Sequence, residues 1–180
     1  ISFHSGTNWS GSHLRQASRF IAVHSLSFPW YVVFHITNWI TNALNERFPK
    51  LDVIWAEGGL AWIPWLMQRL DHEYMMRTSE APGLKKLPSE YMKDMYYSSQ
   101  PCEKMHPEAL EQTFKMIDAE NTMLYASDYP HWDMDVPSVI YDLPFLSEKQ
   151  KRKILGENGA RVFNIDYRDR YPKYKTPNEI

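Results

Sequence analysis

Met123-Leu124-Tyr125-Ala126-Ser127-Asp128-Tyr129-Pro130-His131 is the stretch that decides the fold. Its apolar run ends in a carboxylate and is stopped by a proline, a pattern typical of a buried strand followed by a loop. In barrel enzymes the catalytic residues stand at the carboxyl ends of such strands. A similar fragment, Ile1-Ser2-Phe3-His4-Ser5-Gly6, opens the chain and ends in a histidine before a glycine turn. Histidine and aspartate at separate strand ends suggest a metal site.

Two further strands are predicted between these fragments. One covers residues 51–56 and ends at Glu57-Gly58-Gly59, and the other covers residues 95–99 and ends near Gln100. Apolar periodicity and proline positions predict helices over residues 29–47, 60–76, 106–119, 137–143 and 147–163, with a loop over 78–90. Strands that alternate with helices, with no hairpin signal between them, favour an α/β fold with parallel pairing through right-handed crossovers.

The number of strands is half of what a closed barrel needs. An eight-stranded barrel takes about 250 residues, and this chain offers four strand-helix units in 180 residues. Half a barrel leaves two strand edges exposed, so we expect it to need a partner. The first residue is isoleucine rather than methionine, and we expect the chain to begin partway into a larger gene product.

Composition excludes several classes of function. A hydrophobic content of 43% argues against disorder, and a net charge of -2 with dispersed basic residues argues against a nucleic-acid surface or a polybasic membrane anchor. The longest apolar stretch, 28–40, falls short of the roughly 20 residues of a membrane span. The single cysteine, Cys102, fits a reducing compartment. We expect a soluble, cytoplasmic and oligomeric protein.

Four segments carry a resemblance to a known family: Glu46 to Leu51, Glu57 to Leu66 followed by Arg69-Leu70-Asp71, Ser127 to His131, and Ile154 to Phe163. In this order and spacing the chain resembles the carboxyl-terminal half of the amidohydrolase-related family, which includes aminocarboxymuconate-semialdehyde decarboxylase and the γ-resorcylate decarboxylases. The resemblance covers residues 1–166. It implies strands five to eight of a metal-dependent-hydrolase TIM-like (β/α)8 barrel, and residues 167–180 are predicted to form an extended carboxyl-terminal arm.

The resemblance also implies a metal site. In that family a His-x-His on the first strand, a histidine ending the fifth and an aspartate ending the eighth hold one divalent ion. His4 and Asp128 match the last two. The 180 residues contain no His-x-His, so these ligands must come from an amino-terminal half or from another polypeptide, or else the site is incomplete. We expect zinc, with manganese or iron as alternatives, and a second ion if Glu57 also binds.

Glu57 departs from the decarboxylase pattern, which places a histidine at the end of the sixth strand. A carboxylate beside a metal-bound water is better placed to take a proton than to protonate an aromatic carbon at neutral pH. Asp128 and Glu57 are therefore the expected catalytic residues. A turn aspartate, or a carboxylate that simply bonds the amides of the glycine turn, is the structural alternative.

Four other residues are candidates for contacts around the carboxylates. His131 is placed to orient Asp128 or bind substrate, and His24 lies in the segment that follows the first strand. Trp9 and Trp132, on loops of the presumed catalytic face, are candidates for lining a pocket.

The leading hypothesis is a divalent-metal hydrolase that acts on a small carboxylated or cyclic compound. The ion lowers the pKa of bound water, Asp128 takes its proton, and the hydroxide attacks a carbonyl. The first alternative is non-oxidative, metal-dependent decarboxylation. The others are a dinuclear-metal oxygenase, suggested by the extra carboxylate, and a non-catalytic partner subunit of a heteromeric enzyme, suggested by the absent His-x-His.

Overall fold

A four-stranded parallel sheet forms the centre of the computed structural model, which describes residues 1–7 and 9–167. The strands are β1 (Ser2–His4), β2 (Ile54–Ala56), β3 (Tyr96–Ser98) and β4 (Met123–Leu124), and they pair in chain order. Phe3 pairs with Trp55, and Tyr97 pairs with Met123. Every pair is parallel, as predicted, although each strand is shorter than its apolar run. Except for Tyr167, the predicted arm lies outside the described residues.

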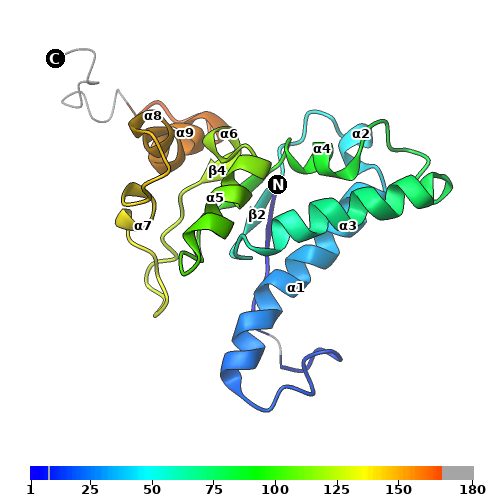
Figure 1. Ribbon diagram of the computed structural model, residues 1–180, viewed down its shortest axis with the longest axis horizontal. Coiled ribbons are helices and arrows are strands. Elements are labelled where there is room, and N and C mark those ends of the chain that lie inside the picture. The colour runs from blue at the N-terminus through cyan, green and yellow to red at the C-terminus, as the bar shows by residue number, and fades with distance from the viewer. Residues whose placement is uncertain (8, 168–180) are drawn as a thin grey trace.

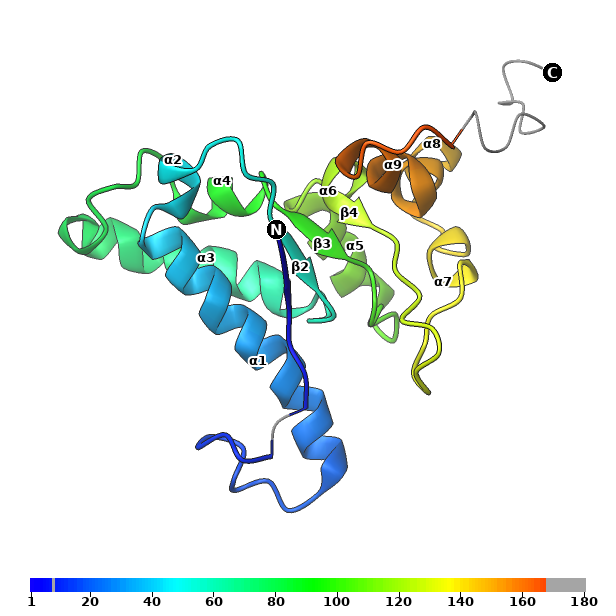
Figure 2. The ribbon, with the colours of Figure 1, turned by 180° about the vertical axis from the view of Figure 1, so that it is seen from behind.

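Helices follow each strand (Figures 1 and 2). They are α1 (Phe20–Thr41), α2 (Leu44–Arg47), α3 (Trp62–Met76), η1 (Thr78–Glu80), α4 (Pro88–Met92), α5 (Pro107–Met116), α6 (Ala119–Thr122), α7 (Ser138–Tyr141), α8 (Glu148–Arg152), the π-helical η2 (Lys153–Glu157) and α9 (Asn158–Val162). The loop predicted over 78–90 was partly wrong, because it contains η1 and the start of α4. Pro88 opens α4 at a position where its missing N–H is not needed.

Helix α1 begins nine residues before the predicted start at Pro29, which lies inside the helix. A proline there removes one backbone hydrogen bond, and the apolar residues upstream continue the helix. Of the described helices, α1 is the one whose length and composition would allow it to cross a bilayer. Its carboxyl-terminal half packs in the core through Val32, Ile36 and Ile40. Its amino-terminal half projects beyond the sheet in both ribbon views (Figures 1 and 2).

The core lies between the sheet and helices α1 and α3. Val32, Ile36, Trp55, Leu60 and Ile63 are buried there. Burying each of these side chains contributes about 1.5–3 kcal/mol relative to exposure. Helix α3 packs in the core through Ile63, Leu66 and Met67, whereas Trp65 is 53% exposed.

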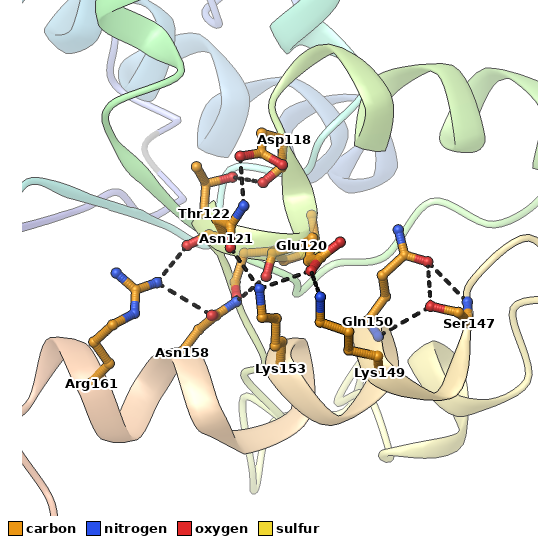
Figure 3. Close-up of polar contacts among 11 residues, drawn as sticks. Asp118, Glu120, Asn121, Thr122, Ser147, Lys149, Gln150, Lys153, Asn158 and Arg161 are labelled. Carbon is orange, nitrogen blue, oxygen red and sulfur yellow. Dashed lines mark hydrogen bonds and ion pairs between the residues drawn. The ribbon is translucent and has the colours of Figure 1, made fainter.

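The outer edge of β4 is covered by the last helical run (Figure 3). The Asn158 side-chain amide donates to the carbonyls of Glu120 and Met123, both at 2.9 Å. The Tyr125 N–H donates to the Ile154 carbonyl at 3.0 Å. The expectation of two exposed strand edges was therefore wrong for β4. The residues Ser2 and His4 of β1, at the other edge, are exposed.

Candidate metal centre

Three side chains with metal-binding atoms converge at one edge of the sheet. Glu57 directly follows β2, and Asp128 and His131 lie in the segment after β4. One ligand atom from each residue can be chosen so that all three lie within 4.8 Å of one another. We call this set the Glu57–Asp128–His131 group. It forms at the carboxyl ends of parallel strands, which is where barrel enzymes carry their catalytic residues.

Asp128 and His131 form the closest pair in the group. The His131 Nδ1 lies 2.8 Å from Asp128 Oδ2 and 2.9 Å from Oδ1, and the His131 backbone N–H donates to the Asp128 carbonyl at 2.9 Å. The hydrogen bond to Asp128 raises the pKa of His131 above its usual value, and the negative charge of Asp128 adds to this effect. This contact is the one expected if His131 orients Asp128.

His4 reaches the group through Glu57. The His4 Nε2 lies 2.5 Å from Glu57 Oε2, so Glu57 contacts the residue at the end of β1 and also lies near Asp128. Burial raises the pKa of Glu57; the nearby charge of Asp128 adds to the rise and His4 opposes it. The structure thus brings His4, Glu57, Asp128 and His131 to one place. The ligand roles of His4 and Asp128 stay predictions.

Both carboxylates stand on an unusual backbone. The φ angle is 56° at Glu57 and 57° at Asp128, in the left-handed region that non-glycine residues rarely adopt. Such conformations cost of order 1–3 kcal/mol and gather at functional sites. The Glu57 N–H is fixed by the Ser98 Oγ at 2.9 Å, so β3 holds the turn after β2 in place.

The glycine turn after Glu57 is held by Glu103, which sequence reasoning missed. The Glu103 Oε2 accepts the N–H groups of Leu60 and Ala61 at 2.8 and 2.7 Å, just before α3 begins. Gly59 has a φ of 67°, and a Cβ there would lie 2.8 Å from Glu103 Oε1. A side chain here would be strained by the positive φ and would push the Glu103 carboxylate aside, so this position favours the second glycine of the motif. The separation of 43 positions between Glu103 and Leu60 left no local signal.

An aromatic pocket with a volume of about 300 Å³ opens beside Glu57. Its walls include His24 and Phe28 of α1, Gln100 after β3, and Trp132 on the loop after Asp128. Of the predicted contact residues, His24 and Trp132 line this pocket. Trp9 does not; its Nε1 donates to the Ala17 carbonyl at 3.3 Å in the segment that precedes α1.

Cys102 takes no part in this chemistry. Burial raises the pKa of its thiol to about 12, and the charge of Asp135 adds to the rise. A thiol with that pKa is almost wholly protonated at neutral pH.

The sequence model of the amidohydrolase family matches residues 3–165. The chain belongs to this amidohydrolase family. The resemblance inferred from the sequence is confirmed, and the parallel sheet with its helices is part of the family's TIM barrel. Among curated proteins the chain has no match.

Several solved structures of the same fold are decarboxylases. The chain is 25% identical to 5-carboxyvanillate decarboxylase from Sphingomonas paucimobilis, with a TM-score of 0.68 over 92% of this chain and 49% of that one. It is similar in fold to a dihydroxybenzoic acid decarboxylase from Polaromonas sp. JS666 with bound manganese (19% identity, TM-score 0.70, 91% of this chain and 49% of that one). It is also similar in fold to the 2,6-dihydroxybenzoate decarboxylase from Rhizobium (20% identity, TM-score 0.67, 92% of this chain and 51% of that one). The chain spans about half the length of each.

Proposed function

We propose that this chain forms half of a metal-dependent, non-oxidative decarboxylase that acts on a small aromatic acid. The observation that carries the proposal is the position of the Glu57–Asp128–His131 group beside an aromatic-lined pocket. A volume of about 300 Å³ is at the small end of ligand pockets, which suits a single ring. The comparisons support decarboxylation over the hydrolysis that the sequence led us to expect.

The donor set fits a divalent ion. Two carboxylates and an imidazole suit manganese, zinc or iron, and three protein ligands are typical of a catalytic site. We propose Asp128 and His131 as the members of the group that hold it, with His4 as the further ligand that the family resemblance implies. Glu57 is then the carboxyl beside the ion that stays free to carry a proton. A bound ion would supply positive charge that draws the oxygen atoms of an acidic substrate to this edge of the sheet.

Decarboxylation breaks the bond between a ring carbon and its carboxylate. Carbon dioxide leaves, the electron pair stays on the ring carbon, and that carbon takes up a proton. Glu57 is the member of the group that lines the pocket, so it is the carboxyl placed to deliver this proton and to regain one from solvent. The sequence alone led us to expect a carboxylate here to take a proton rather than give one; burial, which raises the pKa of Glu57, favours the protonated form that this role needs. Asp128, held by His131, keeps the opposite side of the site negatively charged.

The other half of the barrel completes the site in this proposal. The exposed edge at β1, which carries Ser2 and His4, is where further strands would pair, and they would bring the His-x-His ligands that the family resemblance requires. These strands belong to an amino-terminal half or to a partner chain. We also propose that the complete protein is a cytoplasmic oligomer. In this proposal the half-barrel ends at residue 166.

Product analysis on the full-length, manganese-loaded protein tests the function. With 5-carboxyvanillate or 2,6-dihydroxybenzoate we expect release of carbon dioxide and, in heavy water, one deuterium on the product ring. Glu57→Gln and Asp128→Asn should each lower turnover by at least about 100-fold. Glu148→Gln, at an exposed position of α8, should stay within twofold of wild type.

Three results would contradict the proposal. Turnover of lactones or amides without carbon dioxide would restore the hydrolase. Oxygen consumption with two metal ions per chain would support an oxygenase. A chain that binds no metal yet pairs tightly with a second polypeptide would be a non-catalytic subunit.

A further inference from the structure

A row of aromatic rings joins the start of α1 to the loop after β4. The centroids of the Trp9 and Phe20 rings lie 6.4 Å apart, and those of Phe20 and His24 lie 5.4 Å apart. The row ends at Trp132, whose ring lies 5.2 Å from that of His24. In both ribbon views the start of α1 and this loop extend to the same side of the sheet (Figures 1 and 2). The row therefore makes them one continuous surface.

This surface carries many exposed apolar side chains. We call residues 9–30 the cationic arm and residues 129–136 the acidic loop. Their apolar residues that are at least 38% exposed are Trp9, Phe20, Ile21, Leu26 and Trp30 in the arm and Tyr129, Trp132, Met134 and Val136 in the loop. Contiguous exposed apolar side chains mark interaction sites, and aromatic residues are enriched where two proteins meet.

The two ends of the surface carry opposite charge. Residues 1–45 include Arg15 and Arg19 and contain no aspartate or glutamate. The acidic loop includes Asp133 and Asp135 and contains no lysine or arginine. Among the described residues, none of these four side chains forms an ion pair with a lysine, arginine, aspartate or glutamate. Their charges are thus available to a partner.

A second copy of this chain fits such a surface. In a two-fold dimer the same patch faces itself with its ends reversed. The cationic arm of each copy then meets the acidic loop of the other, which brings arginines to aspartates and the two apolar rows together. Two arms placed face to face would instead bring like charges together, which is unfavourable.

The missing half of the barrel does not by itself cover this surface. Strands that complete the barrel would pair with β1, level with Ser2 and His4. The cationic arm extends beyond the sheet in both ribbon views (Figures 1 and 2). Pairing at β1 therefore leaves the arm free for a second copy.

We propose that the cationic arm and the acidic loop form a self-complementary interface with a second copy of this chain. This inference rests on the proposed function, because it names the surface through which the complete protein is an oligomer. Trp132 also lines the pocket beside Glu57. The second copy therefore covers the mouth of that pocket.

Sedimentation velocity of the full-length protein measures the dissociation constant of the dimer. Ile21→Glu and Arg19→Glu should each raise it by at least about tenfold, because they place a negative charge against the acidic loop of the second copy. Both positions lie at the start of α1, where glutamate favours the helix, so both variants should fold. Met76→Glu, at a position of α3 that is 72% exposed like Ile21, should stay within about twofold of wild type.

Thiol cross-linking tests which parts of the two copies meet. Ile21→Cys and Val136→Cys, mixed and treated with a bismaleimide, should give a cross-linked dimer, because the arm of one copy lies beside the loop of the other. Neither variant should cross-link alone, since the single native cysteine, Cys102, is buried. Ile21→Cys that cross-links to itself, or a mixture that does not cross-link, overturns this arrangement.

The outcome is separable from the test of decarboxylation, because association is measured without substrate. Monomeric wild type, or a dimer that either glutamate variant leaves unchanged, overturns the interface even if carbon dioxide is released. A monomer that co-sediments with vesicles of phosphatidylcholine and phosphatidylglycerol also overturns it, since the apolar α1 would then face a bilayer. A dimer that both glutamate variants break, in a protein that releases no carbon dioxide, contradicts only the proposed reaction.

Discussion

Glu57 and Asp128 face each other across the end of β3, and both carry their carboxylates on left-handed backbone. The two residues follow strands that are not neighbours in the sheet, yet their ligand atoms lie within 4.8 Å. A normal extended backbone would continue each strand past the sheet edge. The positive φ instead turns each chain at the carboxylate, so the fold spends stability to bring two negative charges together.

This strain predicts an unusual order of stability at position 57. Alanine in left-handed backbone costs roughly 1–2 kcal/mol, whereas glycine costs about 0.4–1 kcal/mol through the entropy of the unfolded chain. We therefore expect Glu57→Gly to be at least as stable as Glu57→Ala, by up to about 1 kcal/mol, in urea unfolding. At Gln112, an exposed position of α5, the alanine variant should be about 1 kcal/mol more stable than the glycine variant. If alanine were the more stable replacement at position 57 as well, the backbone at Glu57 would not be strained.

The backbone at Glu57 marks where sequence reasoning stops. The parallel order of strands, the role of residues 60–76 as a packing helix and the convergence of His4, Glu57 and Asp128 follow from apolar runs that end in polar residues. The hydrogen bond from the Glu57 N–H to Ser98 and those from the glycine turn to Glu103 join positions more than 40 apart in the sequence. Local patterns do not encode such contacts. The early start of α1 was missed because a proline was given more weight than the apolar residues before it.

Asn158 should be a stabilising residue rather than a functional one. It is 2% exposed, and its side-chain nitrogen donates to the carbonyl of Glu120 in α6 and to that of Met123 in β4 (Figure 3). Asn158→Ala leaves both carbonyls without that donor, so we expect a loss of about 2–4 kcal/mol in the free energy of unfolding. Asn38→Ala, at an exposed position of α1, should change it by no more than about 0.5 kcal/mol. If Asn158→Ala and Asn38→Ala lowered the free energy of unfolding by similar amounts, the Asn158 hydrogen bonds would not stabilise the fold.

Acid should weaken the contact between α6 and the last helical run. The hydrogen bond from the Lys153 Nζ, 2.8 Å long, lowers the pKa of Glu120; burial opposes it and Lys149 adds to it. A lowered folded-state pKa stabilises the fold above the unfolded-state pKa, and this contribution is lost as pH falls through the folded-state value.

Glu120→Gln should therefore be less stable than wild type at pH 7, and the difference should shrink as pH falls below the ordinary glutamate value of about 4.3. Lys153→Met should reproduce this pH dependence, because it removes the same hydrogen bond. Thermal melts between pH 3 and 7 measure both. A constant difference between Glu120→Gln and wild type across this range would show that the ion pair does not contribute.

Manganese binding to the full-length protein tests the metal site most directly. Calorimetric titration should find that Asp128→Asn weakens binding by more than about 100-fold, beyond the range for loss of an outer-shell partner. The control Asp142→Asn, at an exposed carboxylate after α7, should keep wild-type affinity. An affinity for Asp128→Asn within twofold of Asp142→Asn would show that the Glu57–Asp128–His131 group is not where the metal binds.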